Sequence, residues 1–181
     1  MEALLELRDK GKIRAFGVCN FDRALMEGCT AVAPLTSLQP PYSLLSRDIE
    51  AEILPFCREQ GIGVICYSPM FQGLLTGKIK PGHKFGDGDI REGIPWFKGG
   101  KLESVNEVLV KVVTPIAEGH DATLGQVAVA WCLAQPGITA AIVGARNAEQ
   151  AESNVAAGDL RLRQEELDAI TQAFDRLLET E

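Results

Sequence analysis

Four short apolar segments alternate with stretches of helical periodicity along the chain, and no other feature of the sequence limits the fold as strongly. Parallel strands need a crossover of a dozen or more residues between them, which is usually a helix, so this alternation is typical of a parallel sheet. The apolar segments are also continuous rather than alternating, as in sheets that helices cover on both faces. The sequence therefore predicts the α/β class, with strands at residues 13–18, 36–39, 63–67 and 139–143.

Helix boundaries are marked by residues that favour helix ends. Gly61 follows one expected helix, and Asp22 can cap the start of another. Thr123 and Gln126 form a capping-box pattern before a third. Residues 68–100 instead predict a loop, and a loop that long inside one domain is usually functional or mobile. The expected helices are residues 2–10, 22–29, 46 or 48 to 60, 102–116, 123–135, 147–157 and 167–177.

The composition indicates one soluble globular domain over residues 1–181. Apolar residues make up 46% of the chain and charged residues 24%, and the net charge of −7 comes without any basic stripe. We therefore expect neither nucleic acid nor an anionic membrane surface as a partner. The longest apolar run, residues 127–134, is much shorter than the roughly 20 residues of a membrane span.

The cysteines favour a reducing compartment. Their number, five, is odd, and they show no CxxC or other metal-ligand spacing. The N-terminal residues predict a charged helix rather than a signal peptide, so we expect a cytoplasmic protein. The cysteines that we interpret as reduced and mostly buried are Cys19, Cys29, Cys57, Cys66 and Cys132.

All four expected strands end in polar or aromatic residues. In parallel α/β proteins, ligands bind beyond the carboxyl ends of the strands, so these residues share one edge. Two amides, a flat aromatic ring and a cationic helix start together match what a nicotinamide dinucleotide needs. The strand ends are Cys19–Asn20, Gln39, Tyr67–Ser68 and residues 144–147.

At the nicotinamide end of such a site, Asn20 and Gln39 can pair with the carboxamide, and Tyr67 can stack on the ring. Gly73 and Gly77 let the following loop approach a pyrophosphate closely. Structural alternatives remain open: Asn20 is then only a turn residue, and Tyr67 is a packing aromatic at the rim.

At the adenosine end, Arg146 adds a forked cation suited to a ribose 2′-phosphate, beside the free N–H groups of a helix start. Gln150 and Asn154, one helical turn apart, can reach an adenine edge. The alternatives are that Arg146 is a solvated surface charge and that Asn147 is simply a helix cap.

Other candidate motifs carry less weight. His83 and His120 are expected to be exposed rather than to act as ligands or bases. Gly73-x-x-x-Gly77-Lys78 is one residue short of a P-loop and lacks Ser or Thr after the lysine. No GxGxxG follows a strand, so neither a P-loop nor a Rossmann domain is predicted.

Three ordered segments resemble the aldo/keto reductases, in particular their bacterial and plant-type branch: GKIRAFGVCNF, YSLLSRDIEAEILPFCREQGIGVICYSPMFQGLLTGK and QVAVAWCLAQPGITAAIVGARNAEQAESN. The fold of that family is a (β/α)8 barrel that binds NADPH in an extended pose across its carboxyl-end rim. The resemblance implies that this chain corresponds to strands five to eight, a parallel half of a TIM barrel with surrounding helices. It also implies NADP(H) as the cofactor.

The same resemblance implies which residues bind the cofactor. Cys19 stands where the family usually has serine, which removes a strong hydrogen-bond donor to the carboxamide. Ser153 stands where the family often has glutamate, which leaves adenine selection open. The implied cofactor-binding set is Cys19, Asn20, Gln39, Tyr67, Ser68, Pro69, Gly73, Leu74, Gly77, Gly144, Ala145, Arg146, Gln150 and Asn154.

By the resemblance, the family's catalytic aspartate, tyrosine, lysine and histidine precede the part that this chain matches. Neither Tyr42 nor Tyr67 stands at the proton-donor position, and carbonyl reduction needs such an acid beside the hydride. We therefore expect an NADP(H)-binding module without full carbonyl reductase activity on its own. The alternatives are a non-enzymatic oligomeric interaction protein and a degraded gene fragment.

A half barrel leaves two strand edges and an apolar face unpaired. Two sets of four strands restore eight. We therefore expect a homodimer or a larger oligomer, or a complementing N-terminal half from another chain. The alternative is that the strands rearrange into an open sheet within each subunit.

Overall fold

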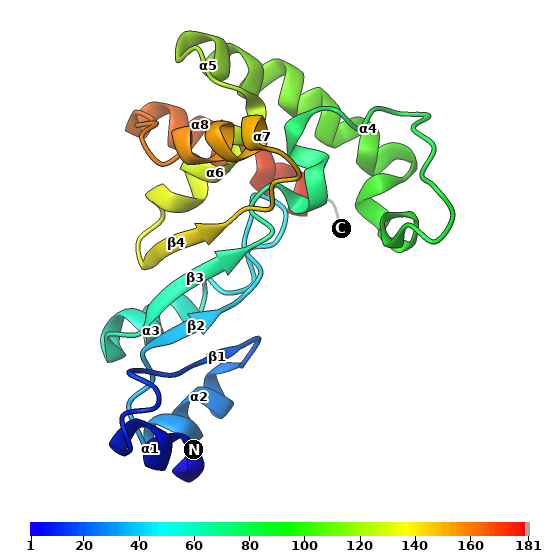
Figure 1. The fold of residues 1–181 in the computed structure, drawn as a ribbon. Helices are drawn as coiled ribbons and strands as arrows, with labels where there is room; N and C mark the ends of the chain where they lie inside the picture. The colour runs from blue at the N-terminus through cyan, green and yellow to red at the C-terminus, as the bar shows by residue number, and fades with distance from the viewer. Residues whose placement is uncertain (180–181) are drawn as a thin grey trace.

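A computed structural model describes residues 1–179, which form one sheet of four parallel strands with helices packed against it (Figure 1). The strand order follows the chain, β1-β2-β3-β4, and each neighbouring pair is parallel. The predicted α/β class and the four parallel strands are therefore confirmed. The elements are α1 (Glu2–Asp9), β1 (Gly17–Cys19), α2 (Arg23–Thr30), β2 (Ser37–Gln39), α3 (Ile53–Gln60), β3 (Gly63–Tyr67), η1 (Phe71–Thr76), η2 (Ile90–Gly93), η3 (Pro95–Phe97), α4 (Gly99–Val108), η4 (Leu109–Val113), α5 (Thr114–Gly119), α6 (Leu124–Ala134), β4 (Ile138–Ile142), α7 (Ala148–Ala156) and α8 (Gln164–Glu179).

The sheet is buried on one face only. Leu38 of β2 and Val64 and Cys66 of β3 are fully buried, whereas the alternating residues of β3 are half-buried. The prediction that both faces are buried is wrong for the described residues, because the buried side chains all project to one side of the pleat. The outer strands β1 and β4 contain no buried residue at all.

The core is deepest at α6, where the apolar run 127–132 is buried throughout. Thr123 and Gln126 form the predicted capping box that starts this helix. Burial then falls toward both ends of the sheet, since neither α1 beside β1 nor α7 after β4 has a buried residue. None of the helices within residues 1–179 is long and apolar enough to cross a membrane.

Two predicted element boundaries are wrong. The first strand covers Gly17–Cys19 rather than residues 13–18, because its partner β2 is only three residues long and ends before Pro40. The third helix begins at Ile53 rather than at Ser46 or Asp48. Pro55 lies in its first turn, where proline is tolerated, and the same proline would break a helix that began earlier.

The stretch 68–100, predicted as a loop, contains three short 3₁₀ segments. Aromatic contacts hold it together: Phe97 stacks on Phe71, and Phe85 lies edge-on to Phe97 with centroids 5.7 Å apart. The predicted helix 102–116 is instead α4, η4 and α5 in succession. The π-helical turn η4 directly precedes Pro115, whose missing N–H disturbs the regular helical ladder.

The two histidines differ from each other. His83 is exposed, as predicted, and its ring lies edge-on to Phe85. His120 was predicted to be exposed, but only 20% of its side chain is accessible. Its Nε2 lies 2.9 Å from Oε2 of Glu166, which is itself buried near the start of α8. The sequence separation of these two residues concealed the contact.

Candidate functional site

A cavity of about 800 Å³ lies at the carboxyl ends of β3 and β4. One wall is the turn after β3, residues 67–73, and the opposite wall is the turn after β4 together with α7. The amino-terminal half of α6 contributes Gly125, Gln126 and Val129. The volume lies within the range of small-molecule and cofactor sites.

The structure brings most of the predicted cofactor residues to this cavity and leaves the others outside its lining. Leu74 is fully buried, and a Cβ at Gly77 would lie 2.6 Å from a methyl group of Leu124, so both serve packing. Those that line the cavity are Tyr67, Ser68, Pro69, Gly73, Gly144, Ala145, Arg146, Gln150 and Asn154. Those outside its lining are Cys19, Asn20, Gln39, Leu74 and Gly77.

Three strand ends are nevertheless joined beside the cavity. The Tyr67 hydroxyl donates to the side-chain Oδ1 of Asn20 at 3.0 Å. The backbone N–H of Asn20 donates to the backbone carbonyl of Gln39 at 3.1 Å. Asn20 has a left-handed backbone (φ 57°), which asparagine tolerates better than most residues. Cys19 and Asn20 are exposed. The carboxyl ends of β1, β2 and β3 therefore present one continuous polar edge.

The turn after β3 has an unusual backbone. Ser68, Phe71 and Gln72 have φ values of 58°, 45° and 51°, and Gly73 has 93°. Three non-glycine residues in the left-handed region within five positions is costly, since each L-residue loses about 1 kcal/mol or more there. Such strain gathers at ligand clamps. The loop is therefore shaped at an energetic cost, along the wall of the cavity.

The turn after β4 is held by its own side chains. Oδ1 of Asn147 accepts from the Gln150 amide at 2.9 Å and caps α7. Oε1 of Gln150 accepts from the Arg146 amide at 2.9 Å, and Nδ2 of Asn154 donates to the Gly144 carbonyl at 3.1 Å. The helix-cap role of Asn147 is thus present, and Gln150 and Asn154 each spend one amide group on the turn.

Positive charge surrounds the cavity. Within residues 1–179 the guanidinium of Arg146 makes no ion pair. Lys78 and Arg91 also line the cavity, although we did not predict them from the sequence. Arg91 binds both carboxylate oxygens of Asp89, at 2.9 and 2.5 Å, and lies over the ring of Phe85.

The ion pair with Arg91 lowers the pKa of Asp89. The hydrogen bonds from the side chain and amide of Arg91 hold this pKa at about 2. Nη1 of Arg91 also reaches the Gln72 carbonyl at 3.4 Å. No local pattern marks Arg91 as a site residue, because only the folded loop returns it to the turn after β3.

Comparison with known proteins shows one family throughout. Residues 1–175 match the sequence model described as "Aldo/keto reductase family". Aldo-keto reductase YhdN of Bacillus subtilis (strain 168) is 36% identical over 152 residues, which are 84% of this chain and 46% of that protein. The NADH-specific methylglyoxal reductase of Escherichia coli (strain K12) is 36% identical over 159 residues, 88% of this chain and 48% of that protein.

Solved structures agree. The glycerol dehydrogenase AKR11B4 from Gluconobacter oxydans superimposes with a TM-score of 0.90 and 32% identity, over 97% of this chain and 53% of that one. The thermostable aldo-keto reductase Tm1743 gives a TM-score of 0.71 and 26% identity over 95% of this chain and 53% of its own. The chain spans about half the length of the relatives that it matches.

Proposed function

The chain belongs to the aldo/keto reductase family, and we propose that it is the NADP(H)-binding part of a carbonyl reductase, built as one half of a (β/α)8 barrel. The names of its relatives suggest an oxidoreductase. The observation that carries the proposal is the cavity, because it joins the turn after β3 to the turn after β4. These are the two walls that an extended dinucleotide needs.

The proposed pose follows from the charges and rings on the walls. Tyr67 would hold the nicotinamide, with Asn20 and Gln39 beyond it at the polar strand edge. Lys78, Arg91 and the strained turn would hold the pyrophosphate. When bound, the nicotinamide supplies or takes up a hydride, and these residues orient it.

The adenosine lies against the turn after β4. Within residues 1–179, Nε2 of Gln150 and Oδ1 of Asn154 have no hydrogen-bond partner, so each would be available to a ligand. Arg146 is the cation available for a 2′-phosphate, and Ser153 beside it brings no competing carboxylate. We therefore propose NADPH over NADH, although one relative is named NADH-specific.

The proton donor is proposed to come from outside residues 1–179. Tyr42 is fully buried, and its phenol donates to Glu50 Oε1 at 2.5 Å. Burial and the Glu50 carboxylate raise its pKa, so it stays protonated and out of reach of a substrate. The Tyr67 hydroxyl is already engaged with Asn20.

The partner is proposed to be a second half barrel that closes on β1 and β4. Both outer strands and both outer helices lack buried residues, and Leu7, Ile142 and Val155 are exposed there. An N-terminal half of a family member or a second copy of this chain satisfies the same two parallel edges. Only the N-terminal half also brings the family's catalytic residues.

Fluorescence titration tests the cofactor proposal. Purified chain is titrated with NADPH, NADH and 2′,5′-ADP, which carries both adenosine phosphates but no nicotinamide. We expect saturable binding of NADPH and 2′,5′-ADP, weaker binding of NADH, and no carbonyl turnover without an added N-terminal half. Absence of any binding up to millimolar NADPH contradicts the proposal, and so does ordinary turnover by the chain alone.

Light scattering tests the partner. A homodimer has twice the 19.6 kDa mass of the chain. Co-expression with the N-terminal half of a relative such as YhdN distinguishes the two occupants, since a complementing half shifts the homodimer to a heterodimer and restores turnover. A monomer at micromolar concentration that binds little apolar dye contradicts the homodimer, and the absence of a complex on co-expression contradicts the complementing half.

If the chain assembles but binds no nucleotide, the non-enzymatic interaction protein becomes the better candidate. The bare outer strands and helices are the observation that favours it. Assembly and nucleotide binding are therefore measured on the same preparation.

A further inference from the structure

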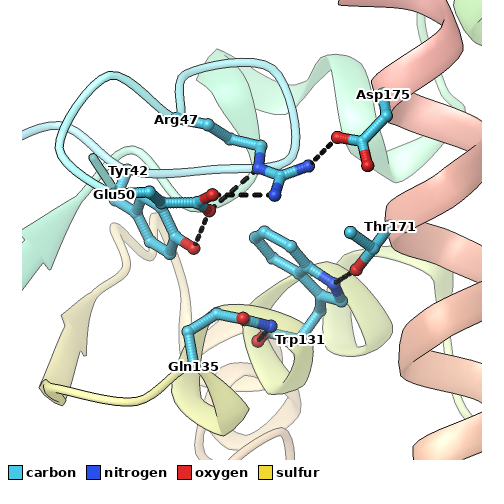
Figure 2. A network of polar contacts seen from close by, with 7 residues as sticks. All are labelled: Tyr42, Arg47, Glu50, Trp131, Gln135, Thr171 and Asp175. Atoms are coloured by element: carbon cyan, nitrogen blue, oxygen red, sulfur yellow. Dashed lines mark hydrogen bonds and ion pairs between the residues drawn. The ribbon is translucent and has the colours of Figure 1, made fainter.

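A polar network joins the segment after β2 to α6 and α8 (Figure 2), and none of the seven residues drawn lines the cavity. Nε and Nη2 of Arg47 donate to the two carboxylate oxygens of Glu50 at 2.8 and 2.7 Å, while the Tyr42 hydroxyl donates to the same carboxylate. The third guanidinium nitrogen, Nη1, pairs with Asp175 of α8. The segment between β2 and α3 is thereby fastened to the last helix of the chain.

Trp131 of α6 forms the floor of this network. Its ring stacks on Tyr42, with centroids 5.6 Å apart, and the Arg47 guanidinium lies over it at 5.5 Å. The indole Nε1 donates to Thr171 of α8 at 3.0 Å. Figure 2 shows the ring enclosed between Tyr42, Arg47 and α8. Trp131 and Tyr42 are both fully buried.

The main chain of Tyr42 connects this network to the candidate site. The Tyr42 amide donates to the Tyr67 carbonyl at 3.1 Å, and the Tyr67 amide donates to the Pro40 carbonyl at 2.9 Å. Both backbone groups of Tyr67 are therefore held by residues 40–42. Gln39 is the residue immediately before this segment, at the end of β2.

Helix α6 connects the same network to another part of the cavity lining. Val129 and Gln126 of α6 line the cavity, and Trp131 is only two residues beyond Val129. The thiol of Cys132 approaches the Tyr42 carbonyl at 3.8 Å, which ties the same helix to the same segment. Tyr42 therefore contacts both the main chain of Tyr67 and helix α6.

We propose that Tyr42, Glu50 and Arg47 are positioning residues for the cofactor: they hold Tyr67 and Gln39 at the spacing from α6 in which the Tyr67 ring meets a nicotinamide. This inference rests on the proposed function for its ligand, but the positioning itself is a property of the free protein. None of the three residues lines the cavity, so they would act on a bound ligand only through Tyr67 and Gln39.

The test compares two carboxylates that each bind an arginine. Glu50→Gln breaks the network, and Tyr42→Phe removes only its hydroxyl while keeping the ring on Trp131. Glu166→Gln is the matched control, since Glu166 accepts from Arg163 and contacts His120 but does not line the cavity. The two variants are compared under conditions in which Glu50→Gln and Glu166→Gln have the same free energy of unfolding.

Hydrogen exchange of the free protein is the first readout. We expect the backbone amides of Tyr67 and Tyr42 to exchange about tenfold faster in Glu50→Gln than in Glu166→Gln, since the local opening that exposes them no longer has to break the hydrogen bonds of the Glu50 carboxylate to Tyr42 and Arg47. Tyr42→Phe gives the same direction with a smaller change. Equal exchange of these two amides in the matched variants overturns the proposal, whether or not any cofactor binds.

The second readout is the affinity ratio of NADPH to 2′,5′-ADP. We expect Glu50→Gln to weaken NADPH binding several-fold while 2′,5′-ADP binding stays within twofold, because only NADPH reaches Tyr67. An equal loss for both ligands reduces the network to a general structural role and also overturns the proposal. Failure of the proposed function is distinguished by the unaltered chain, which then binds neither ligand.

Discussion

The two ends of the proposed cofactor site, one for the nicotinamide and one for the adenosine, are built in different ways. At the nicotinamide end, Tyr67, Asn20 and Gln39 come from three strands, and Tyr67 depends on a network that reaches Asp175. At the adenosine end, three side-chain hydrogen bonds shape the turn, and each joins residues no more than ten positions apart. One end is a product of tertiary packing, and the other is a local structure attached to the sheet.

This difference implies different responses to damage. A change at the nicotinamide end disturbs the core, because Trp131 and Tyr42 are fully buried. A change at the adenosine end remains local, because α7 has no buried residue. The four predictions below test that contrast, beginning with the largest effect.

Truncation of Trp131, which packs against Tyr42 and Arg47 of the network, gives the largest loss of stability. Trp131→Ala deletes a fully buried indole together with its stack on Tyr42, and such truncations cost about 3–5 kcal/mol. Val155→Ala at the adenosine end, where the side chain is 74% exposed, changes stability by less than about 0.5 kcal/mol. Urea denaturation measures both, and comparable losses would remove the contrast.

Loss of Arg146, which makes no ion pair within residues 1–179, comes next. Arg146→Ala should weaken NADPH roughly 10- to 100-fold, since charge-assisted hydrogen bonds contribute about 1.5–3 kcal/mol each. NADH, which lacks the 2′-phosphate, should bind as before. Arg23→Ala on the exposed face of α2 serves as control. Equal weakening of both cofactors would place Arg146 at the pyrophosphate instead.

Removal of the α7 cap has a smaller, local effect. Asn147→Ala should cost the first turn of α7 about 1 kcal/mol. The Gln150 amide, which donates to Asn147, should exchange faster, while the urea midpoint of the whole chain stays the same. Asp22→Ala makes the equivalent change at the start of α2. A clear shift of the global midpoint would show that α7 is part of the cooperative core.

The smallest expected effect is a pH dependence of stability that arises from the ion pair between Asp89 and Arg91. Arg91 lowers the pKa of Asp89 to about 2, so the contribution of this pair is present above the ordinary carboxylate range and is lost as the pH falls toward 2. Unaltered protein and Asp89→Asn should therefore differ slightly in stability near pH 6 and converge as the pH falls below about 2. Carboxyl NMR titration of Asp89 gives the midpoint directly, and one near 4 contradicts the pairing.

Sequence patterns were reliable where the governing contacts are local. The α/β class follows from strand–helix alternation, and the caps at Asp22, Thr123 and Asn147 depend on an amide only three residues ahead. The boundaries of β1 and α3 were misplaced because pairing length and proline tolerance depend on the neighbouring strand and on helix position.

The site was predicted in part for the same reason. The segments 67–73 and 144–154 are recognisable in the sequence by their glycines, amides and a cation at strand ends. Arg91 is not, because a loop of aromatic contacts returns it to Gln72, 19 positions earlier in the chain. Tyr42 and Arg47 are not either, since the contact from Arg47 to Asp175 spans 128 positions.

By itself, the sequence determined the order of strands and helices, the family, and the turn after β4, because these depend on periodicity and on hydrogen bonds between near neighbours. Only the tertiary structure decided that one face of the sheet is bare within residues 1–179, that Lys78 and Arg91 meet at the cavity, and that Tyr67 is held through Tyr42. Such contacts join segments far apart in the chain, and only the packing of α6 and α8 against the sheet brings them within hydrogen-bond distance.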